Sequence, residues 1–216
     1  MATAADNCNI ALWDAHAGTY IDTFEYAGDI FSLEFLPDGQ LASGNKSGEI
    51  SFWNIATGIR VKFQAHSDRL NSLSTSQYKF ASGSGDKTSR KRIYTFECDR
   101  PARSVALYPK NRVAACTKEK LYVWDIAAQK LEASRNINEC KGVAVSTDGR
   151  WLAVSTDESV SLYDASTLDC IWSHDRDSWS VSFSPVNWCL QITKVAKWSY
   201  LMFKLEILSS LSNMEK

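Results

Sequence analysis

Short stretches of alternating apolar and polar residues recur along most of the chain, separated by turn residues. In DIFSLEFLPDGQLASG (29–44) and CKGVAVSTDGRWLAVSTDES (140–159), one alternating strand leads into a Pro-Asp-Gly or Thr-Asp-Gly turn, and a second strand follows. Alternation with a period of two is typical of strands with one buried face, and these turn residues are typical of tight connections. The pattern predicts antiparallel meanders from about residue 8 to residue 186.

A third kind of strand ends in an aromatic residue, in the segments NIALWD, EISFWN, LYVWD and VSLYD. Trp13 and Trp53 are 40 residues apart, Trp53 and Trp124 are 71 apart, and Trp124 and Tyr163 are 39 apart. Tyr94, in RKRIYTF, divides the interval of 71 into 41 and 30. A repeat of roughly 40 residues is typical of the blades of a β-propeller.

Four units are complete in this pattern, at about 29–65, 66–100, 101–136 and 137–173. Residues 8–25 supply two strands of a further blade and residues 178–184 supply one, so the two ends of the chain are predicted to combine. One sheet cannot bury both of its faces alone, whereas radially stacked sheets cover each other. We expect the apolar residues of the innermost strands to be Leu33, Phe35, Val105, Leu107, Val143, Val145, Val181 and Phe183. Those of the third strands are Ile50, Phe52, Leu121, Val123, Val160 and Leu162.

These units resemble the WD40 repeat family over about residues 8–186. The resemblance implies an all-β, WD40-like propeller of about five blades, four complete and two half-blades. It also implies that a His, a Ser, an Asp and an aromatic residue form a buried hydrogen-bonded group that pins a blade. The residues in these repeat positions are His66, Ser82, Asp86 and Tyr94 in the best unit, and Trp13, Trp53, Trp124, Tyr163 and His174 elsewhere.

The units depart from the family pattern in two ways. Tyr94 replaces a Trp, and SRKRIY is about two residues longer than the family spacing, which predicts a bulge or an altered register. The His position is occupied by Tyr26, Cys98 and Asn136 in three units. We therefore expect those blades to depend more on packing than on the polar group.

The repeat stops after Val186. The apolar residues of 187–216 are mostly three or four apart, which predicts a short amphipathic helix in this C-terminal tail. Lys194, Lys197 and Lys204 interrupt the roughly 20 apolar residues that a membrane span needs. We expect two parts, a propeller at 1–186 and a non-repeat tail at 187–216, in a truncated or alternatively spliced form of a larger protein.

Composition narrows the functional classes. The net charge is −1, so no overall field attracts nucleic acid or an anionic membrane. The N-terminus has no basic start and no apolar core, which argues against a secretory signal and favours an intracellular location, cytoplasmic or nuclear. The six cysteines are scattered without a C-x-x-C pair, so buried free thiols are the simplest interpretation.

Candidate chemistry is sparse. The chain has three histidines, and two of them, His66 and His174, hold repeat positions, so we predict no catalytic residues. No His, Cys or Asp group has the spacing of a metal site, and no cofactor or small-molecule substrate is expected. The basic cluster in DKTSRKR (86–92) would suit phosphate or nuclear import, yet such clusters are more often solvated faces, so nucleic acid is not favoured.

One set of residues remains, where each innermost strand begins. Aligning the units places Phe31, Asn71, Arg103, Lys141 and Trp179 at equivalent positions. Grouped aromatic, amide and basic side chains favour binding hot spots, and unrelated surface residues are the alternative. The leading hypothesis is a non-catalytic scaffold for a protein or peptide partner. Its rivals are an enzyme or small-molecule binder that uses the central channel, and a truncated isoform without stable function.

Overall fold

The chain folds, in a computed structural model, as β-strands joined by turns and loops throughout the part that the structure describes. That part comprises residues 1–4, 9–26, 28–76, 79–86, 95–109, 111–175, 177–183, 189–193 and 201–204. The strands pair antiparallel with their neighbours in sequence, as a meander requires. The all-β propeller predicted from the repeat is confirmed.

Six sheets follow one another along the chain. The first holds β1 (Ala2–Ala4), β2 (Asn9–Trp13) and β3 (Tyr20–Glu25), and the second holds β4 (Ile30–Phe35), β5 (Leu41–Asn45), β6 (Glu49–Trp53) and β7 (Arg60–Gln64). The third holds β8 (Leu70–Ser76) and β9 (Lys79–Ser84), and the fourth holds β10 (Ser104–Leu107), β11 (Arg112–Cys116), β12 (Lys120–Asp125) and β13 (Lys130–Asn136). The fifth holds β14 (Gly142–Val145), β15 (Trp151–Ser155), β16 (Ser159–Asp164) and β17 (Cys170–Asp175), and the sixth holds β18 (Ser180–Phe183), β19 (Cys189–Thr193) and β20 (Leu201–Lys204).

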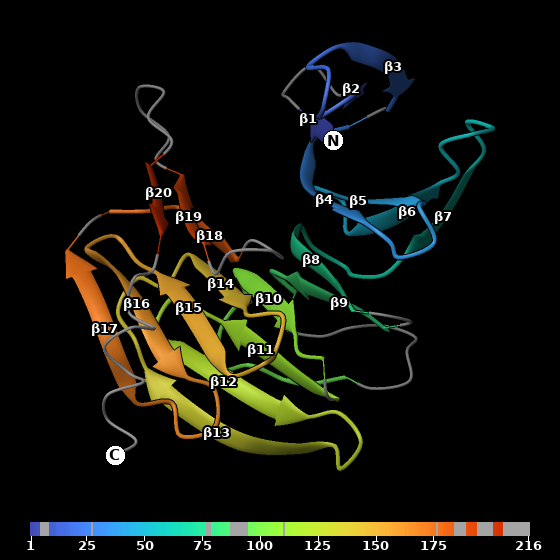
Figure 1. Cartoon of the computed structure of the whole chain (residues 1–216). Helices are drawn as coiled ribbons and strands as arrows, with labels where there is room; N and C mark the ends of the chain where they lie inside the picture. The colour runs from blue at the N-terminus through green and yellow to red at the C-terminus, as the bar shows by residue number, and fades with distance from the viewer. Residues whose placement is uncertain are drawn as a thin grey trace.

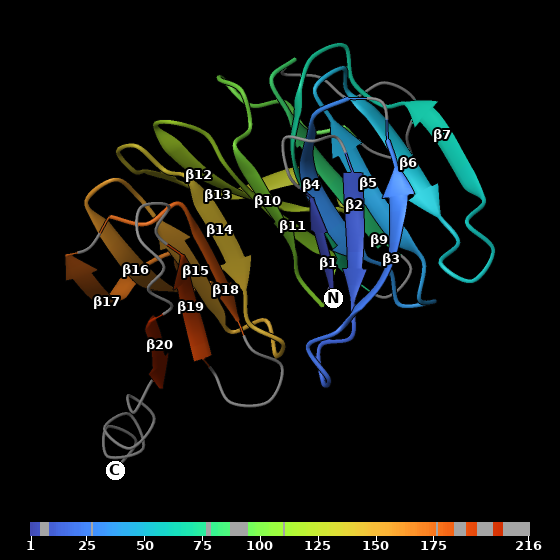
Figure 2. The same cartoon turned by 90° about the horizontal axis from the view of Figure 1, so that it is seen from above.

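The sheets are arranged as an arc about a shared axis, with β1–β3 and β18–β20 at its two ends (Figure 1). The first strands of the sheets, β1, β4, β8, β10, β14 and β18, lie nearest the axis, and each lies against the next. Figure 2, turned by 90°, shows that the strands run lengthwise along this axis. Strands β4, β8, β10, β14 and β18 therefore begin at the same end of the molecule, which we call the rim. Strand β1 runs in the opposite direction, because it is antiparallel to β2.

The four predicted complete units correspond to β4–β7, β8–β9, β10–β13 and β14–β17. The remainder of the second unit includes Tyr94 and the predicted bulge in SRKRIY, and residues 87–94 lie outside the described residues. The other three units each form a four-stranded sheet.

Apolar side chains of adjacent sheets fill the space between them. One cluster joins the fourth and fifth sheets, where Leu121 and Val123 of β12 and Leu152 of β15 have no exposed surface. The predicted third-strand residues Ile50 and Val160 are also completely buried. Because each sheet buries its faces only against its neighbours, the array is cooperative in the way that repeat proteins are.

Serine hydroxyls also join neighbouring innermost strands, which do not pair with one another as sheet strands do. The hydroxyl of Ser32 accepts the backbone N–H of Leu73 at 3.0 Å, and that of Ser72 accepts the N–H of Val105 at 3.2 Å. Ser104 accepts the N–H of Val143 at 3.2 Å in the same way. These bonds give a partner to backbone N–H groups that would otherwise be unpaired at the edges of the sheets. They fix how adjacent sheets sit at the axis.

The two ends of the chain do not combine into one blade as predicted. Strand β1 pairs with β2, Ala2 lying opposite Leu12, and β18 pairs with β19, Ser180 lying opposite Thr193. Each end is therefore a separate three-stranded sheet. The prediction failed at the N-terminus because Ala2–Ala4 is too short to show alternation.

The predicted helix in the tail is also wrong where the structure describes this segment. Cys189–Thr193 and Leu201–Lys204 are strands β19 and β20. The three-or-four spacing of apolar residues came from two strands and their connection taken together, and pairing with β18 satisfies the backbone groups of β19. The predicted boundary after residue 186 stays a prediction.

Candidate functional site at the rim

The register of the sheets places the five predicted rim residues at equivalent positions. Ser72 lies opposite Gly83, Ser104 opposite Cys116, and Gly142 opposite Ser155 at the rim ends of their innermost strands. Ser32 and Ser180 occupy the corresponding positions in β4 and β18. In chain order, the residues that directly precede these five positions are Phe31, Asn71, Arg103, Lys141 and Trp179.

Phe31 and Asn71 share one neighbour, Arg69, which lies in the connection that leads into β8. The guanidinium carbon of Arg69 lies 5.0 Å from the centroid of the Phe31 ring, a cation–π contact. Its Nε donates to Oδ1 of Asn71 at 2.7 Å, and Nδ2 of Asn71 donates to the carbonyl of Ala102 at 2.7 Å. Asn71 thus holds Arg69 in place and ties the second unit to the third.

Arg103 connects the third unit to the fourth. Its Nη1 donates to the carbonyl of Cys140 at 3.1 Å and lies 3.3 Å from Oε2 of Glu139. Glu139 also pairs with Lys118, whose Nζ is 2.8 Å from Oε1. The hydrogen bond from Lys118, aided by Arg103, lowers the pKa of Glu139, so this carboxylate stays ionised.

Lys141 and Trp179 form the last link. The side chain of Lys141 is only 13% exposed and pairs with Asp157 and, at 3.5 Å, with Asp177. Its ammonium lies 4.1 Å from the centroid of the Trp179 ring. Trp179 is 57% exposed, because its ring lies at the surface beside this ion pair. Lys141 therefore holds other groups more than it offers a charge to solvent.

These contacts form one line across the rim. Phe31 contacts Arg69, Asn71 reaches Ala102, Arg103 reaches Cys140, and Lys141 reaches Trp179. Each link runs from one unit to a residue that is at the rim position of the next unit or at most two residues before it. The five residues are therefore connected through their neighbours.

Several charged residues of this line were missed by the sequence analysis. Arg69, Lys118 and Glu139 lie in connections between strands, where no alternation marks them. For Arg69 and Glu139 a usable signal was closeness in sequence to a rim position, since Arg69 precedes Asn71 by two residues and Glu139 precedes Lys141 by two. Lys118 is not close to a rim position in the sequence.

The second unit contains the polar group that the family resemblance implies. Nε2 of His66 lies 2.7 Å from the hydroxyl of Ser82, and Nδ1 lies 3.2 Å from Oδ1 of Asp86. The backbone N–H of Ser67 donates to Oδ2 of Asp86 at 2.7 Å. The side chains of His66 and Asp86 are each only 3% exposed, so these bonds are made away from water. Tyr94, the fourth member, lies outside the described residues.

Replacing His66 with alanine is expected to lower the free energy of unfolding by about 1–3 kcal/mol, because the buried carboxylate of Asp86 and the half-buried hydroxyl of Ser82 each lose a hydrogen-bond partner. Chemical denaturation of the full chain measures this loss. Ser82→Ala should cost less, since His66 keeps its contact with Asp86. An unfolding free energy unchanged in both variants would contradict a pinning role.

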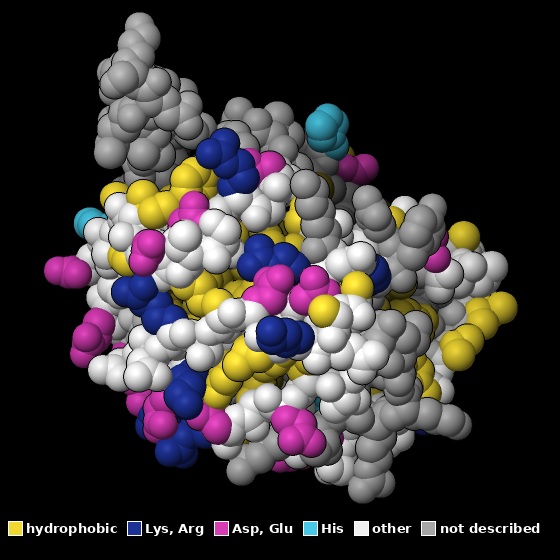
Figure 3. Space-filling view, turned by 90° about the horizontal axis from the view of Figure 1, so that it is seen from below, with side chains coloured by type: hydrophobic (Ala, Val, Ile, Leu, Met, Phe, Trp, Pro, Cys, Tyr) yellow, Lys and Arg dark blue, Asp and Glu magenta, His cyan; other side chains and the backbone are white. Residues whose placement is uncertain are grey.

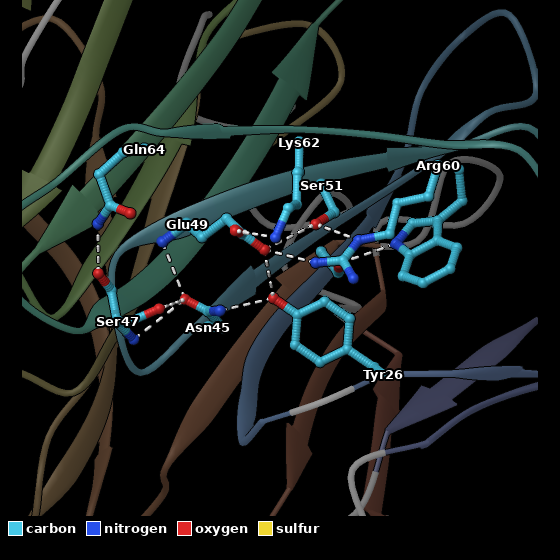
Figure 4. Close-up of polar contacts among 10 residues, drawn as sticks. Tyr26, Asn45, Ser47, Glu49, Ser51, Arg60, Lys62 and Gln64 are labelled. Atoms are coloured by element: carbon cyan, nitrogen blue, oxygen red, sulfur yellow. Dashed lines mark hydrogen bonds and ion pairs between the residues drawn. The ribbon is translucent and has the colours of Figure 1, made fainter.

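The first unit has a different polar network, which the sequence analysis did not foresee (Figure 4). Tyr26 accepts a hydrogen bond from Asn45 Nδ2 at 2.6 Å and donates one to Glu49 at 3.2 Å. Arg60 also belongs to this network. Its Nη2 lies 2.5 Å from Oε1 of Glu49, and its guanidinium carbon lies 4.3 Å from the centroid of the Tyr26 ring. Tyr26 thus takes part in a network of its own, beyond the packing expected for this unit.

Trp53 of the same unit forms a hydrogen bond with a serine. Its indole Nε1 donates to the hydroxyl of Ser43 at 2.9 Å. Trp13 makes a similar bond to Thr3, also at 2.9 Å. Trp124 and Tyr163 end the third strands of their units and are buried among apolar neighbours. Trp53, Trp124 and Tyr163 are thus buried in the packing between sheets, whereas Trp13 is half-buried.

His174 does not occupy a place like that of His66. It lies within β17 and is paired with Val160. The equivalent pair in the second sheet is Phe63 and Ile50, so His174 corresponds to Phe63 and not to His66. Eight positions separate Gln64 from Ser72, whereas five separate Asp175 from Ser180, so this connection is three residues shorter. The imidazole of His174 is exposed and stacks on Trp172, with ring centroids 5.9 Å apart.

Within the described ranges, no group of three His, Cys, Asp or Glu residues is arranged to hold a metal ion. The same ranges contain no helix long and apolar enough to cross a bilayer. Cys116 and Cys140 are buried thiols, and burial raises the pKa of Cys140 well above its usual value.

Two comparisons relate this chain to known proteins. The profile of the family described as "WD domain, G-beta repeat" matches residues 18–54 and 130–164. Periodic tryptophan protein 2 from Arabidopsis thaliana is 37% identical over 62 residues, a match that covers 27% of this chain and 7% of that protein. The matched part is therefore a small fraction of this relative.

Proposed function

We propose that this chain, which folds as a β-propeller arrangement and matches the WD40 repeat profile at residues 18–54 and 130–164, works as a non-catalytic scaffold. In this proposal the rim binds a protein or peptide partner. The observation that carries it is the line of contacts from Phe31 to Trp179, which joins equivalent positions of successive units.

Rigidity of the rim supports binding. Loops held by a fixed framework are frequent binding sites, because a surface that is ordered before binding loses less entropy when a partner arrives. At the rim, Asn71 fixes Arg69 and Ala102, while Asp157 and Asp177 fix Lys141. We assign Asn71 and Lys141 to the face as residues that position their neighbours.

Exposed aromatic rings supply the contact area. Phe31 is 43% exposed and Trp179 is 57% exposed, and each has a cation against its ring. Aromatic residues and arginine dominate binding energy at many protein interfaces. Phe31, Arg103 and Trp179 are therefore the residues that we expect to touch the partner.

A double variant, Arg103→Ala with Trp179→Ala, tests the rim. The immobilised full chain should lose roughly tenfold or more of its specific partner capture from lysate, because two contact residues are removed. The circular dichroism spectrum should remain unchanged. Captured proteins are identified and quantified by mass spectrometry for the wild type and each variant.

The matched control, Arg150→Ala with Tyr20→Ala, removes an arginine and an exposed aromatic ring at the opposite ends of the strands. It should capture the same partners as the wild type. Equal capture by the rim variant, or equal loss by the control, would reject the rim as the binding face.

A further inference from the structure

A pocket of about 480 Å³ opens at the rim between the second and third units. Five cationic side chains line it, from Lys46, Arg69, Arg100, Arg103 and Lys118. One carboxylate, Asp68, lies among the lining residues. Its volume is within the range of about 300–1,000 Å³ that is usual for ligand sites.

The fold brings these cations together from separate connections. Lys46 lies between β5 and β6, Arg69 before β8, Arg100 and Arg103 before β10, and Lys118 between β11 and β12. All of these connections meet at the rim. The sequence spreads the five residues over more than seventy positions, so only the arrangement of the sheets creates the cluster.

Four of the five cations have carboxylate partners that are not among the lining residues. Lys46 lies 3.5 Å from Asp29 and Arg100 lies 3.0 Å from Glu119. Glu139 pairs with both Arg103 and Lys118. These carboxylates offset repulsion among the cations and hold their side chains in place. Together with Asp68, these three carboxylates give four negative charges in and around the pocket, against five positive charges.

Arg69 differs from the other four cations. Within the described residues its guanidinium has no carboxylate partner, only the Nε bond to Asn71 and the ring of Phe31. Its main chain is fixed, because its carbonyl accepts the N–H of Gly85 at 3.0 Å and the hydroxyl of Ser84 at 2.9 Å. The terminal nitrogens of a guanidinium held in this way suit a planar carboxylate, which they can bind through two parallel hydrogen bonds.

The charges favour an acidic peptide over a nucleic acid. One carboxylate would balance the single excess positive charge of the pocket, whereas a phosphodiester chain would also bring negative charges close to Asp29, Glu119 and Glu139. Pro101 in the lining and the exposed Phe31 ring beside Arg69 offer apolar contacts to the peptide around that carboxylate. The net charge of the whole chain is −1, so a negatively charged segment would be attracted by this local group of cations and not by the overall charge.

Figure 3 views the molecule from below Figure 1 and shows Lys and Arg side chains next to Asp and Glu side chains, with hydrophobic side chains between them. Neither sign of charge gathers alone on this face.

We propose that this pocket binds a segment of the partner protein through one aspartate or glutamate side chain, with the guanidinium of Arg69 receiving its carboxylate. The inference rests on the proposed scaffold function and names the chemistry of the segment that the rim recognises. Arg103 and Lys118 contribute positive charge to the same pocket while remaining paired with Glu139.

Fluorescence anisotropy with the purified full chain tests the pocket. The probe is a fluorescein-labelled peptide with a single Glu at low ionic strength, compared with the same peptide carrying Gln in place of that Glu. Arg69→Gln is expected to weaken binding of the Glu peptide roughly tenfold, because it removes the guanidinium that has no carboxylate partner within the described residues. Added salt should weaken wild-type binding, since the attraction is between charges.

Arg150→Gln is the matched control. Arg150 is exposed and its guanidinium lies 5.5 Å from the centroid of the Trp151 ring, so this variant also removes a cation from an aromatic ring, away from the rim. It should bind the Glu peptide as the wild type does. Circular dichroism and thermal unfolding of both variants exclude a folding defect as the cause.

Four results would overturn the inference: no binding of the Glu peptide, equal binding of the Gln peptide, equal binding by Arg69→Gln, or equal weakening by Arg150→Gln. A phosphoserine peptide that binds roughly tenfold tighter than the Glu peptide would overturn the carboxylate assignment in favour of phosphate. Single-stranded DNA that competes better than the peptide would overturn the choice of a protein segment. None of these results affects the Arg103 and Trp179 capture experiment, so the scaffold proposal stands or falls separately.

Discussion

Gly48→Ala is expected to lower the free energy of unfolding by about 2–5 kcal/mol. Gly48 has a φ of +79°, where an L side chain costs about 1–2 kcal/mol. A Cβ at this position would lie 2.4 Å from the carbonyl oxygen of His66 and 2.6 Å from that of Asp68. Those atoms are backbone, so the connection between β7 and β8 must shift, which adds about 1–3 kcal/mol.

Gly58→Ala is the matched control for this prediction. Gly58 also has a positive φ, +70°, but a Cβ there would meet no atom within 4 Å. We expect it to cost only the conformational part, about 1–2 kcal/mol. Urea denaturation of both variants separates strain from collision. Equal losses in the two variants would show that the close approach at Gly48 has no energetic weight.

Trp53→Ala is expected to cost about 3–5 kcal/mol, the usual range for removing a large buried aromatic side chain. Trp53 is 3% exposed and stacks on Phe24 of the first sheet with ring centroids 5.4 Å apart. Its removal opens a cavity between the first and second sheets and leaves the buried hydroxyl of Ser43 without the indole donor. The first sheet should therefore exchange its amide hydrogens faster than the rest of the chain.

Two further variants check the origin of this loss. Trp53→Phe keeps much of the packing and loses the bond to Ser43, so it should cost less than Trp53→Ala. Trp179→Ala removes an exposed tryptophan and should change the free energy of unfolding by less than about 0.5 kcal/mol. If Trp53→Ala were as stable as Trp179→Ala, the packing of the first sheet on the second would not depend on Trp53.

Much of the fold was predictable from the repeat, because alternation and turn residues are local properties. The alternating residues of β10, β14 and β18 were read directly from the sequence, and so were the aromatic ends of β6, β12 and β16. The errors fell where a local signal was too short or came from more than one element. Ala2–Ala4 has three residues, and the spacing in 187–216 mixed two strands.

The candidate site was predictable only in part. Counting along the units found the five rim positions, because each unit starts its innermost strand in the same register. Counting failed for His174, since the connection after β17 is three residues shorter than the one after β7. A position that is equivalent in sequence is equivalent in space only when the pairing registers also agree.

The sequence by itself determined that this chain forms small antiparallel sheets in tandem, since period-two alternation, turn residues and an aromatic residue about every 40 positions are written into it. Only the tertiary structure decided which side chains meet at the rim. Arg69 and Arg103 share a pocket because two sheets pack side by side, and Glu139 joins Arg103 to Lys118 for the same reason. Contacts between charged groups in loops depend on distances in space, which no periodicity along the chain encodes.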